Sequence, residues 1–342
     1  MNIKFDRKKY GPIIFAFLLL LLLLFVKTGY ESKEIYAQAE RVKVEVLSTD
    51  ESDIIDTGLV RSGEQRCKVK ILQGIFEGEE AEAVNRLNGS LSEDKLFSAG
   101  DIAYVAISYS DGNITYISMN DHYRLGKEAL LAGLFFVLLI GFAGWTGVRA
   151  ILSFIVTILL MWKVLVPFML KGYNPIWVSL GIVVLLCFIV LSLIYGFDRR
   201  CVASLSGSVL GILVTCVLGI IFTDYFQIHG AVMEASESLL YAGYSTLNLT
   251  QIFMASIFLG SSGAIMDLSV DICSAVNEVV EKKPDISIKE AIKSGFAVGR
   301  AACGSTTTTL LLAYSGSYIA LLMVFMAQGT PVSFILNYKY VA

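Results

Sequence analysis

The sequence predicts an α-helical integral membrane bundle of about seven spans, with a small extracytoplasmic β-barrel-like domain inserted after the first span. Of the 342 residues, 55% are hydrophobic, and the mean hydropathy is +0.67. Soluble globular proteins have an apolar share of about 45–50%. One apolar run precedes, and six follow, a polar segment in which apolar and polar residues alternate, residues 30–126. Long apolar runs are typical of membrane helices, and alternation is typical of half-buried strands.

Residues 1–29 have an arrangement that secretory signal peptides and signal anchors share, a basic start followed by an apolar run. The basic residues Lys4, Arg7, Lys8 and Lys9 precede an apolar run from Pro12 to Val26. The small-x-small sequence Ala37-Gln38-Ala39 lies well beyond this run, whereas signal peptidase sites follow the run closely. We therefore expect residues 1–29 to remain attached as an N-terminal anchor helix.

The acidic segment 30–126 is expected to fold as one β-rich domain outside the bilayer. Alternation predicts five short strands, at Arg41 to Leu47, Gln65 to Leu72, Ala81 to Asn85, Ile102 to Ser108 and Ile114 to Met119. Asp111-Gly112-Asn113 lies between the last two strands and is typical of a tight hairpin turn, because glycine tolerates a positive φ. Five short strands indicate a small barrel or sandwich.

Residues 127–342 are expected to form the polytopic membrane domain. The core of a bilayer is about 30 Å thick, and a helix rises about 1.5 Å per residue. Six apolar segments are long enough, or nearly so: Ala129 to Trp145, Ala150 to Leu170, Ile176 to Ile194, Val202 to Phe222, Ile252 to Asp267 and Thr306 to Met326. With the anchor helix they predict about seven spans.

The positions of Lys and Arg predict the orientation, because short cytoplasmic loops retain basic residues. A cytoplasmic N-terminus places most basic loop residues in the cytoplasm: Arg149, Arg199, Arg200, Lys282, Lys283, Lys289, Lys293 and Arg300. The loop from Thr223 to Thr250 has no Lys or Arg and falls on the other side, with residues 30–126. Lys171 and Lys339 do not follow this rule. We expect residues 30–126 to be extracellular.

Several classes of function are disfavoured by the motifs that the chain lacks. It has no G-x-S-x-G elbow, Walker loop or H-E-x-x-H, so we expect no enzyme, and Ser261 or Ser262 would have no evident base. It has no C-x-x-C, and its two histidines are far apart, so we expect neither a metal site nor a cofactor. The balance of 27 basic and 30 acidic residues indicates no nucleic-acid partner.

Small residues along the predicted spans provide smooth surfaces on which helices can pack closely. Gly207 and Gly211 form a G-x-x-x-G sequence, and three further glycines stand beside hydroxyl residues: Gly260, Gly263 and Gly304. Packing within the bundle is their commoner use. Lining of a transport path is the alternative.

Acidic residues at helical spacing end the sixth predicted span. Asp267, Asp271 and Glu278 stand at i, i+4 and i+11, which places them on one side of a helix. A carboxylate facing lipid is costly, so Asp267 is expected to face the bundle interior, water or a cation. It could instead reach the headgroup region or pair with Arg300, a purely structural role.

Hydroxyl residues begin the seventh predicted span, at 305–309, and Ser262 precedes Asp267. Hydroxyls such as those of Ser262, Thr306 and Thr308 can coordinate a small cation. More often they bond to a carbonyl one turn earlier in the helix.

These two segments resemble the YibE/F family of multi-pass bacterial membrane proteins. The resemblance is carried by Gly263 to Asp267, Gly299-Arg300, Gly304, Thr306, Thr308 and Leu310 to Tyr314, and it extends to the β-rich domain. It implies a location in the bacterial plasma membrane and a possible permease activity, without a substrate. Two positions depart from the family's pattern: Ala301 and Thr308 stand where an Asp and an Asn are expected. Family members continue through a further helix, so we expect a missing final helix or a partner that supplies it.

We therefore interpret the chain as a permease with its site between the sixth and seventh spans. Asp267 is expected to hold a cation or proton, with Asp271 beside it. The oxygen ligands would come from Ser262, Thr306 and Thr308, and Arg300 would pair with an acid. The alternative is a structural or assembly protein that acts through its extracellular domain, with the bundle as an anchor. The expected partners are the lipid bilayer and a homologous membrane subunit or a second copy of the chain.

Overall fold

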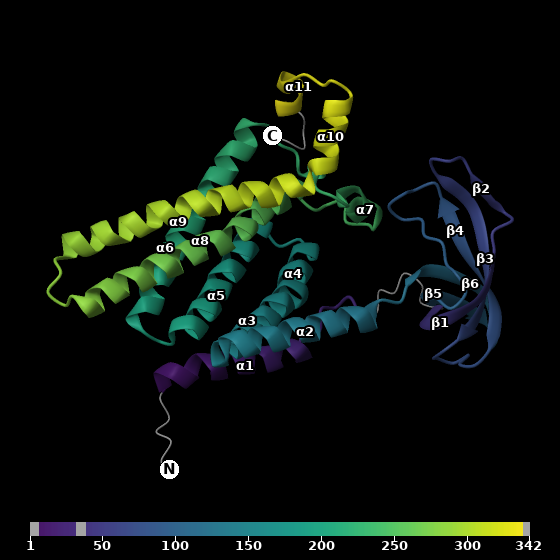
Figure 1. Cartoon of the computed structure of the whole chain (residues 1–342), viewed down its shortest axis with the longest axis horizontal. Coiled ribbons are helices and arrows are strands. Elements are labelled where there is room, and N and C mark those ends of the chain that lie inside the picture. The colour runs from purple at the N-terminus through teal and green to yellow at the C-terminus, as the bar shows by residue number, and fades with distance from the viewer. Residues whose placement is uncertain (1–6, 32–38, 338–342) are drawn as a thin grey trace, which may run out of the picture. The chain divides into compact units, whose positions relative to one another are not determined.

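The computed structural model describes residues 7–31 and 39–337 (Figure 1). Expectations that rest on Lys4, on Ala37 and Gln38, or on Lys339 therefore lie outside the described residues. The chain divides into two compact units, residues 31–138 and residues 1–30 with 139–342. Each unit is described by itself.

The first unit contains a small closed barrel. Its strands are β1 (Ala39–Asp50), β2 (Ile54–Asp56), β3 (Arg61–Ile71), β4 (Glu80–Asn88), β5 (Ile102–Ser110) and β6 (Asn113–His122). Five long strands close in the order β1-β3-β4-β6-β5, with β5 returning to β1, and β2 is a short addition to β3. All pairings are antiparallel except that of β4 with β6. This order is that of an OB-fold barrel.

The barrel core follows from the alternation in the sequence, because every second side chain of a strand faces inward. The inward residues that are almost fully buried include Val42, Val44 and Val46 of β1, Val69 and Ile71 of β3, and Val105 and Ile107 of β5. The expectation of a five-stranded barrel-like domain is confirmed. Strand β2 was not predicted, because three residues are too few for an alternating pattern.

Two polar side chains inside the barrel hold the loop between β4 and β5. Gln65 donates to the carbonyl of Phe97 at 2.8 Å and accepts from the Phe97 N–H at 3.0 Å. Asn85 donates to Gln65 at 3.0 Å and to the carbonyl of Lys95 at 2.6 Å. Buried polar groups need partners of this kind, so the two side chains fix the path of residues 95–97 across the barrel end.

The helices belong to the second unit, the membrane domain, apart from residues 125–138 of α2, which belong to the first unit. They are α1 (Arg7–Phe25), α2 (Leu125–Ala143), α3 (Trp145–Leu160), α4 (Val166–Leu170), α5 (Pro175–Tyr195), α6 (Arg199–Tyr225), α7 (Ser236–Tyr241), α8 (Leu249–Lys282), α9 (Ile288–Ser317), α10 (Ile319–Ala327) and α11 (Val332–Leu336). A π-helical turn, Met161–Leu165, joins α3 to α4. Helix α5 packs against α1, α3, α6 and α8. It is apolar on every side, as a helix at the centre of a bundle must be.

Two basic side chains bind α3, and the π-helical turn that follows it, to neighbouring helices. Arg149 donates to the carbonyl of Leu193 near the end of α5 at 3.3 Å. Lys163 donates to the carbonyl of Val26, just after α1, at 3.0 Å. The carbonyls at a helix C-terminus lack partners within the helix and carry partial negative charge, so cations are stabilised there.

The chain is a membrane protein by its apolar helices, but the count of seven spans is not confirmed. Five helices are long and apolar enough to cross a bilayer: α2, the continuous α3–α4, α5, α6 and α8. Helices α9 and α10 would be a sixth span, bent by 65° at their junction, and the apolar part of α1 is shorter, Tyr10–Phe25. The segment expected as a single span from Thr306 to Met326 is interrupted by this bend. Local hydropathy detects neither the break nor the polar first half of α9.

Candidate functional site

The acidic residues of α8 share one face of that helix. Asp267, Asp271 and Glu278 lie within an arc of about 40° at about 100° per residue, and all three side chains are exposed. Helix α8 runs for 34 residues, about 50 Å, well past the end expected at Asp267. Among the described residues, neither Asp267 nor Asp271 forms an ion pair or a hydrogen bond through its carboxylate.

A tyrosine at the end of α5 fixes the level of Asp271. The Tyr195 hydroxyl bonds the Ser274 hydroxyl at 2.7 Å and donates to the carbonyl of Val270 at 2.8 Å. The guanidinium of Arg200 lies over the Tyr195 ring, 5.5 Å from its centroid. Asp271 thus lies level with the end of α5, and the last turns of α8 extend beyond it. Sequence reasoning missed Tyr195, although a tyrosine beside Arg199 and Arg200 is typical of a membrane interface.

Most hydroxyls of the expected site bond within their own helices. Such bonds, to a carbonyl three or four residues earlier, are formed by Ser262 (2.7 Å), Ser305 (3.0 Å), Thr307 (2.8 Å), Thr308 (3.2 Å) and Thr309 (3.0 Å). Thr306 is the exception: it is half-buried, and its hydroxyl has no hydrogen bond to another described residue. Of the expected oxygen ligands, Thr306 is therefore the one that is free to meet a ligand.

Arg300 lies apart from the acids that it was expected to meet. Its neighbour Gly299 packs on Ile272, which is about 100° around α8 from Asp271. Arg300 is exposed and forms no ion pair with the residues described. It lines an apolar groove of about 780 Å³ between α8 and α9, with Phe296 and Cys303 on the α9 side.

Helices α8 and α9 lie side by side (Figure 1), and small residues set this contact. A Cβ atom on Gly295 would stand 2.9 Å from Val276, and one on Gly299 would stand 3.0 Å from Ile272. These glycines form a second G-x-x-x-G sequence, which the sequence analysis missed although its spacing is that of Gly207 and Gly211.

The expected packing glycines occupy different environments. A Cβ atom on Gly211 would lie 2.7 Å from Ile265, and one on Gly207 would lie 3.5 Å from the Ser269 hydroxyl, so both stand where α6 meets α8. A Cβ atom on Gly260 would lie 3.7 Å from the Tyr314 hydroxyl of α9. Added Cβ atoms at Gly263 and Gly304 would meet nothing within 4 Å.

Charge and ligand number limit what the site can hold by itself. Within the described ranges, no group of three or more His, Cys, Asp or Glu side chains could hold a metal ion. One or two carboxylates with a hydroxyl suit a proton or a weakly held cation, and a tighter site needs further ligands. Backbone carbonyls freed at a helix break can supply such ligands in membrane transporters.

Comparison with known proteins bears on the membrane domain alone. The family model described as YibE/F-like protein matches residues 131–342, from within α2 to the last residue. The expected extension of the resemblance to the β-rich domain lies outside this match. No curated protein and no solved structure matches the chain.

Proposed function

The chain belongs to the YibE/F-like family, and we propose that it is a multi-pass membrane permease for a small solute or ion. The observation that carries this function is the Asp267 carboxylate, which stands within an apolar helix and has no partner among the described residues. An acid in a membrane helix is costly, up to about 3 kcal/mol at the centre of the bilayer. A helix that serves only as an anchor gains nothing from that cost.

The site lies between α8 and α9 in this proposal. Asp267 holds the cation or proton, Asp271 adds a second charge on the same face, and Thr306 supplies a hydroxyl oxygen. Ser262 and Thr308 serve as ligands only if their bonds within the helix open. The bend between α9 and α10 supports transport, because broken helices are common at transporter sites. No catalytic step, cofactor or nucleic acid is part of this function.

A structural or assembly role for the barrel is the second candidate. The barrel has its own hydrophobic core and its own buried polar network, so it could act as a rigid recognition module. In that case the bundle is an anchor, and the Asp267 carboxylate has no role in the protein's activity.

The accessibility of Asp267 to water tests the proposal that the protein is a permease. In a cysteine-free variant, cysteines that replace Asp267 or Thr306 should react with a hydrophilic methanethiosulfonate at least about tenfold faster than one at Leu210, since only a wetted thiol ionises. Leu210 is a suitable control because it is 64% exposed and its neighbour Gly211 packs on Ile265, near the depth of Asp267. Equal, slow rates at all three positions would exclude a water-filled path and end the permease interpretation.

We also propose that the protein lies in the bacterial plasma membrane with its N-terminus in the cytoplasm and its barrel outside. The basic cluster at 282–300 supports this orientation. In intact cells, an impermeant thiol reagent should label a cysteine at Asp111 and spare one at Lys289. The opposite pattern would reverse the orientation.

We propose a second copy of the chain as the partner at α9. This 30-residue helix has one buried residue, Gly295, although it carries Arg300 and exposed threonines. In a two-fold pair the same patch of both copies forms the interface, so residue i of one copy contacts residue j of the other and the reverse. Arg300 of one copy could therefore reach the acidic face of the other. The charges are complementary, and among the described residues Arg300, Asp267 and Asp271 form no ion pair within the chain.

Oxidative crosslinking in native membranes checks this pairing. With the other five cysteines replaced, Cys303, which is exposed and lines the α8–α9 groove, should form a disulfide with its own copy and give a dimer band. The matched control is a cysteine at Leu210 in a Cys303→Ser background, which should stay monomeric. Absence of the Cys303 dimer, or crosslinking only to a different membrane subunit, would contradict the two-fold pair.

A further inference from the structure

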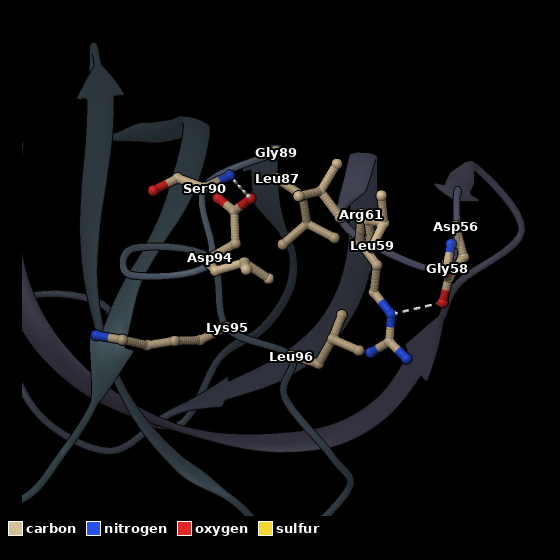
Figure 2. Close-up of a pocket in the computed structure, with 12 residues that line it drawn as sticks. Asp56, Gly58, Leu59, Arg61, Leu87, Gly89, Ser90, Asp94, Lys95 and Leu96 are labelled. Carbon is tan, nitrogen blue, oxygen red and sulfur yellow. Dashed lines mark hydrogen bonds and ion pairs between the residues drawn. The ribbon is translucent and has the colours of Figure 1, made fainter. Parts of the chain in front are cut away.

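Two exposed leucines stand at one end of the barrel. The loops of residues 51–60 and 89–101 join β1 to β3 and β4 to β5, so both lie where β1 and β4 end. Leu59 in the first loop is 84% exposed, and Leu91 in the second is 82% exposed. Both line a single pocket of about 340 Å³, which Figure 2 shows between the two loops.

The charged groups around this pocket are already paired. Arg61 bonds Asp56 at 2.8 Å, and the Asp94 carboxylate accepts from the backbone N–H of Ser90 at 2.7 Å (Figure 2). The same carboxylate accepts from the backbone N–H of Asn88 at 3.0 Å. These bonds hold the pKa of Asp56 and of Asp94 below the usual value for an aspartate. The groups left to meet a partner are aliphatic: Leu59, Val60, Leu91 and Leu96, with the buried Leu87 behind them.

The same end of the barrel continues directly into a membrane helix. The Tyr123 N–H donates to the carbonyl of Ile102 at 2.8 Å, which is the last bond of the barrel, and the Arg124 carbonyl accepts the first bond of α2, from Glu128, at 3.0 Å. Only Tyr123 and Arg124 stand between β6 and α2. Three peptide steps from His122 to Leu125 span at most about 10 Å.

Ion pairs connect the loop of residues 89–101, which carries Leu91, to the junction between β6 and α2. Lys95 pairs with Asp121, and Arg124 pairs with the same carboxylate at 3.4 Å. His122 lies 3.8 Å from Asp101 at the other end of that loop. The loop of residues 89–101 is therefore held beside the start of α2, the candidate span that follows the barrel.

We infer that this end of the barrel docks on the membrane leaflet on its own side, with Leu59 and Leu91 inserted among the lipid chains. Exposed leucines that occur singly need no explanation. Here two of them flank one aliphatic pocket at the barrel end that is joined to a span, and lipid is the apolar phase within reach. This docking is independent of the permease function and of which side of the membrane the barrel occupies.

Depth measurements on the full chain in phosphatidylcholine nanodiscs test the docking. Single cysteines at Leu59, Leu91 and Ile75, in a cysteine-free background, are labelled with an environment-sensitive fluorophore. Ile75 is the matched control, because it is 70% exposed on the loop between β3 and β4, at the opposite end of the barrel. Lipids with nitroxide-labelled acyl chains should quench the labels at 59 and 91 about twofold, because inserted side chains reach about 5–10 Å into the leaflet. The label at 75 should be unaffected.

Each other outcome overturns the inference. Quenching that is equally weak at all three positions would place both leucines in water. Equal quenching at position 75 would show that the barrel has no preferred end toward lipid. Labels at 59 and 91 that are shielded from aqueous iodide but untouched by the lipid quencher would show that protein, not lipid, covers the pocket.

Discussion

Replacement of Asp267 by asparagine is expected to abolish transport while the protein still folds and accumulates. Asparagine keeps the shape of the side chain but can neither carry a negative charge nor hold a proton at neutral pH. If the carboxylate holds the transported or coupling ion, its loss should lower the flux by at least about 100-fold, equivalent to about 2.7 kcal/mol. The measurement is flux into proteoliposomes, screened over cations and proton gradients, at equal protein content.

A matched control lies on the same face of the same helix. Glu278 is exposed and paired with Lys282 at 2.5 Å, and it lies beyond the level at which α5 ends. Glu278→Gln should therefore transport at nearly the wild-type rate. If Asp267→Asn also behaves like the wild type, while deletion of the barrel removes the phenotype, the permease interpretation is wrong and the assembly role is favoured.

A failure of Asp267→Asn to accumulate would have a different meaning. The acid would then be needed for structure, and its partner would be Arg300. Because Arg300 forms no ion pair among the residues described, that partner would belong to a second copy. Arg300→Gln in the same chain should then restore accumulation, since it removes the charge left unpaired.

Replacement of Gln65 by leucine is expected to destabilise the barrel by about 3 kcal/mol, because each buried polar group left without a partner costs about 1–3 kcal/mol. The groups that would lose their partner are the N–H and carbonyl of Phe97 and one N–H of the Asn85 amide, whose other N–H keeps its bond to the Lys95 carbonyl. Leucine fills a similar volume, so lost packing contributes little. The control is Glu82→Leu on the exposed side of β4, which should change stability by less than about 0.5 kcal/mol.

The buried thiol of Cys67 reports barrel opening in the full-length protein. Cys67 is fully buried in β3, and burial raises the pKa of its thiol to about 11. With the other cysteines replaced, its labelling requires opening of the barrel. Gln65→Leu should speed this labelling on the order of 100-fold, in proportion to the opening constant. An unchanged rate would mean that the polar network contributes nothing to stability.

The sequence by itself predicted the features that depend on local periodicity. Four spans lie within a few residues of α2, α3–α4, α5 and α6, and five predicted strands overlap β1, β3, β4, β5 and β6. The shared face of Asp267, Asp271 and Glu278 follows from the rise and twist of a helix and needs no tertiary information. Hydropathy and spacing determine these features because each is a property of one segment.

Only the tertiary structure decided which segments meet. The closed strand order of the barrel depends on pairing between strands distant in sequence, such as β4 with β6, and no local pattern encodes it. The place of Arg300 depends on Gly299, which packs α9 on Ile272, about 100° around α8 from Asp271. The bend at the end of α9 interrupts a run that is apolar throughout. The chemistry of a side chain determines which kinds of partner it can bind. The packing of the other elements determines which of these partners lies within reach.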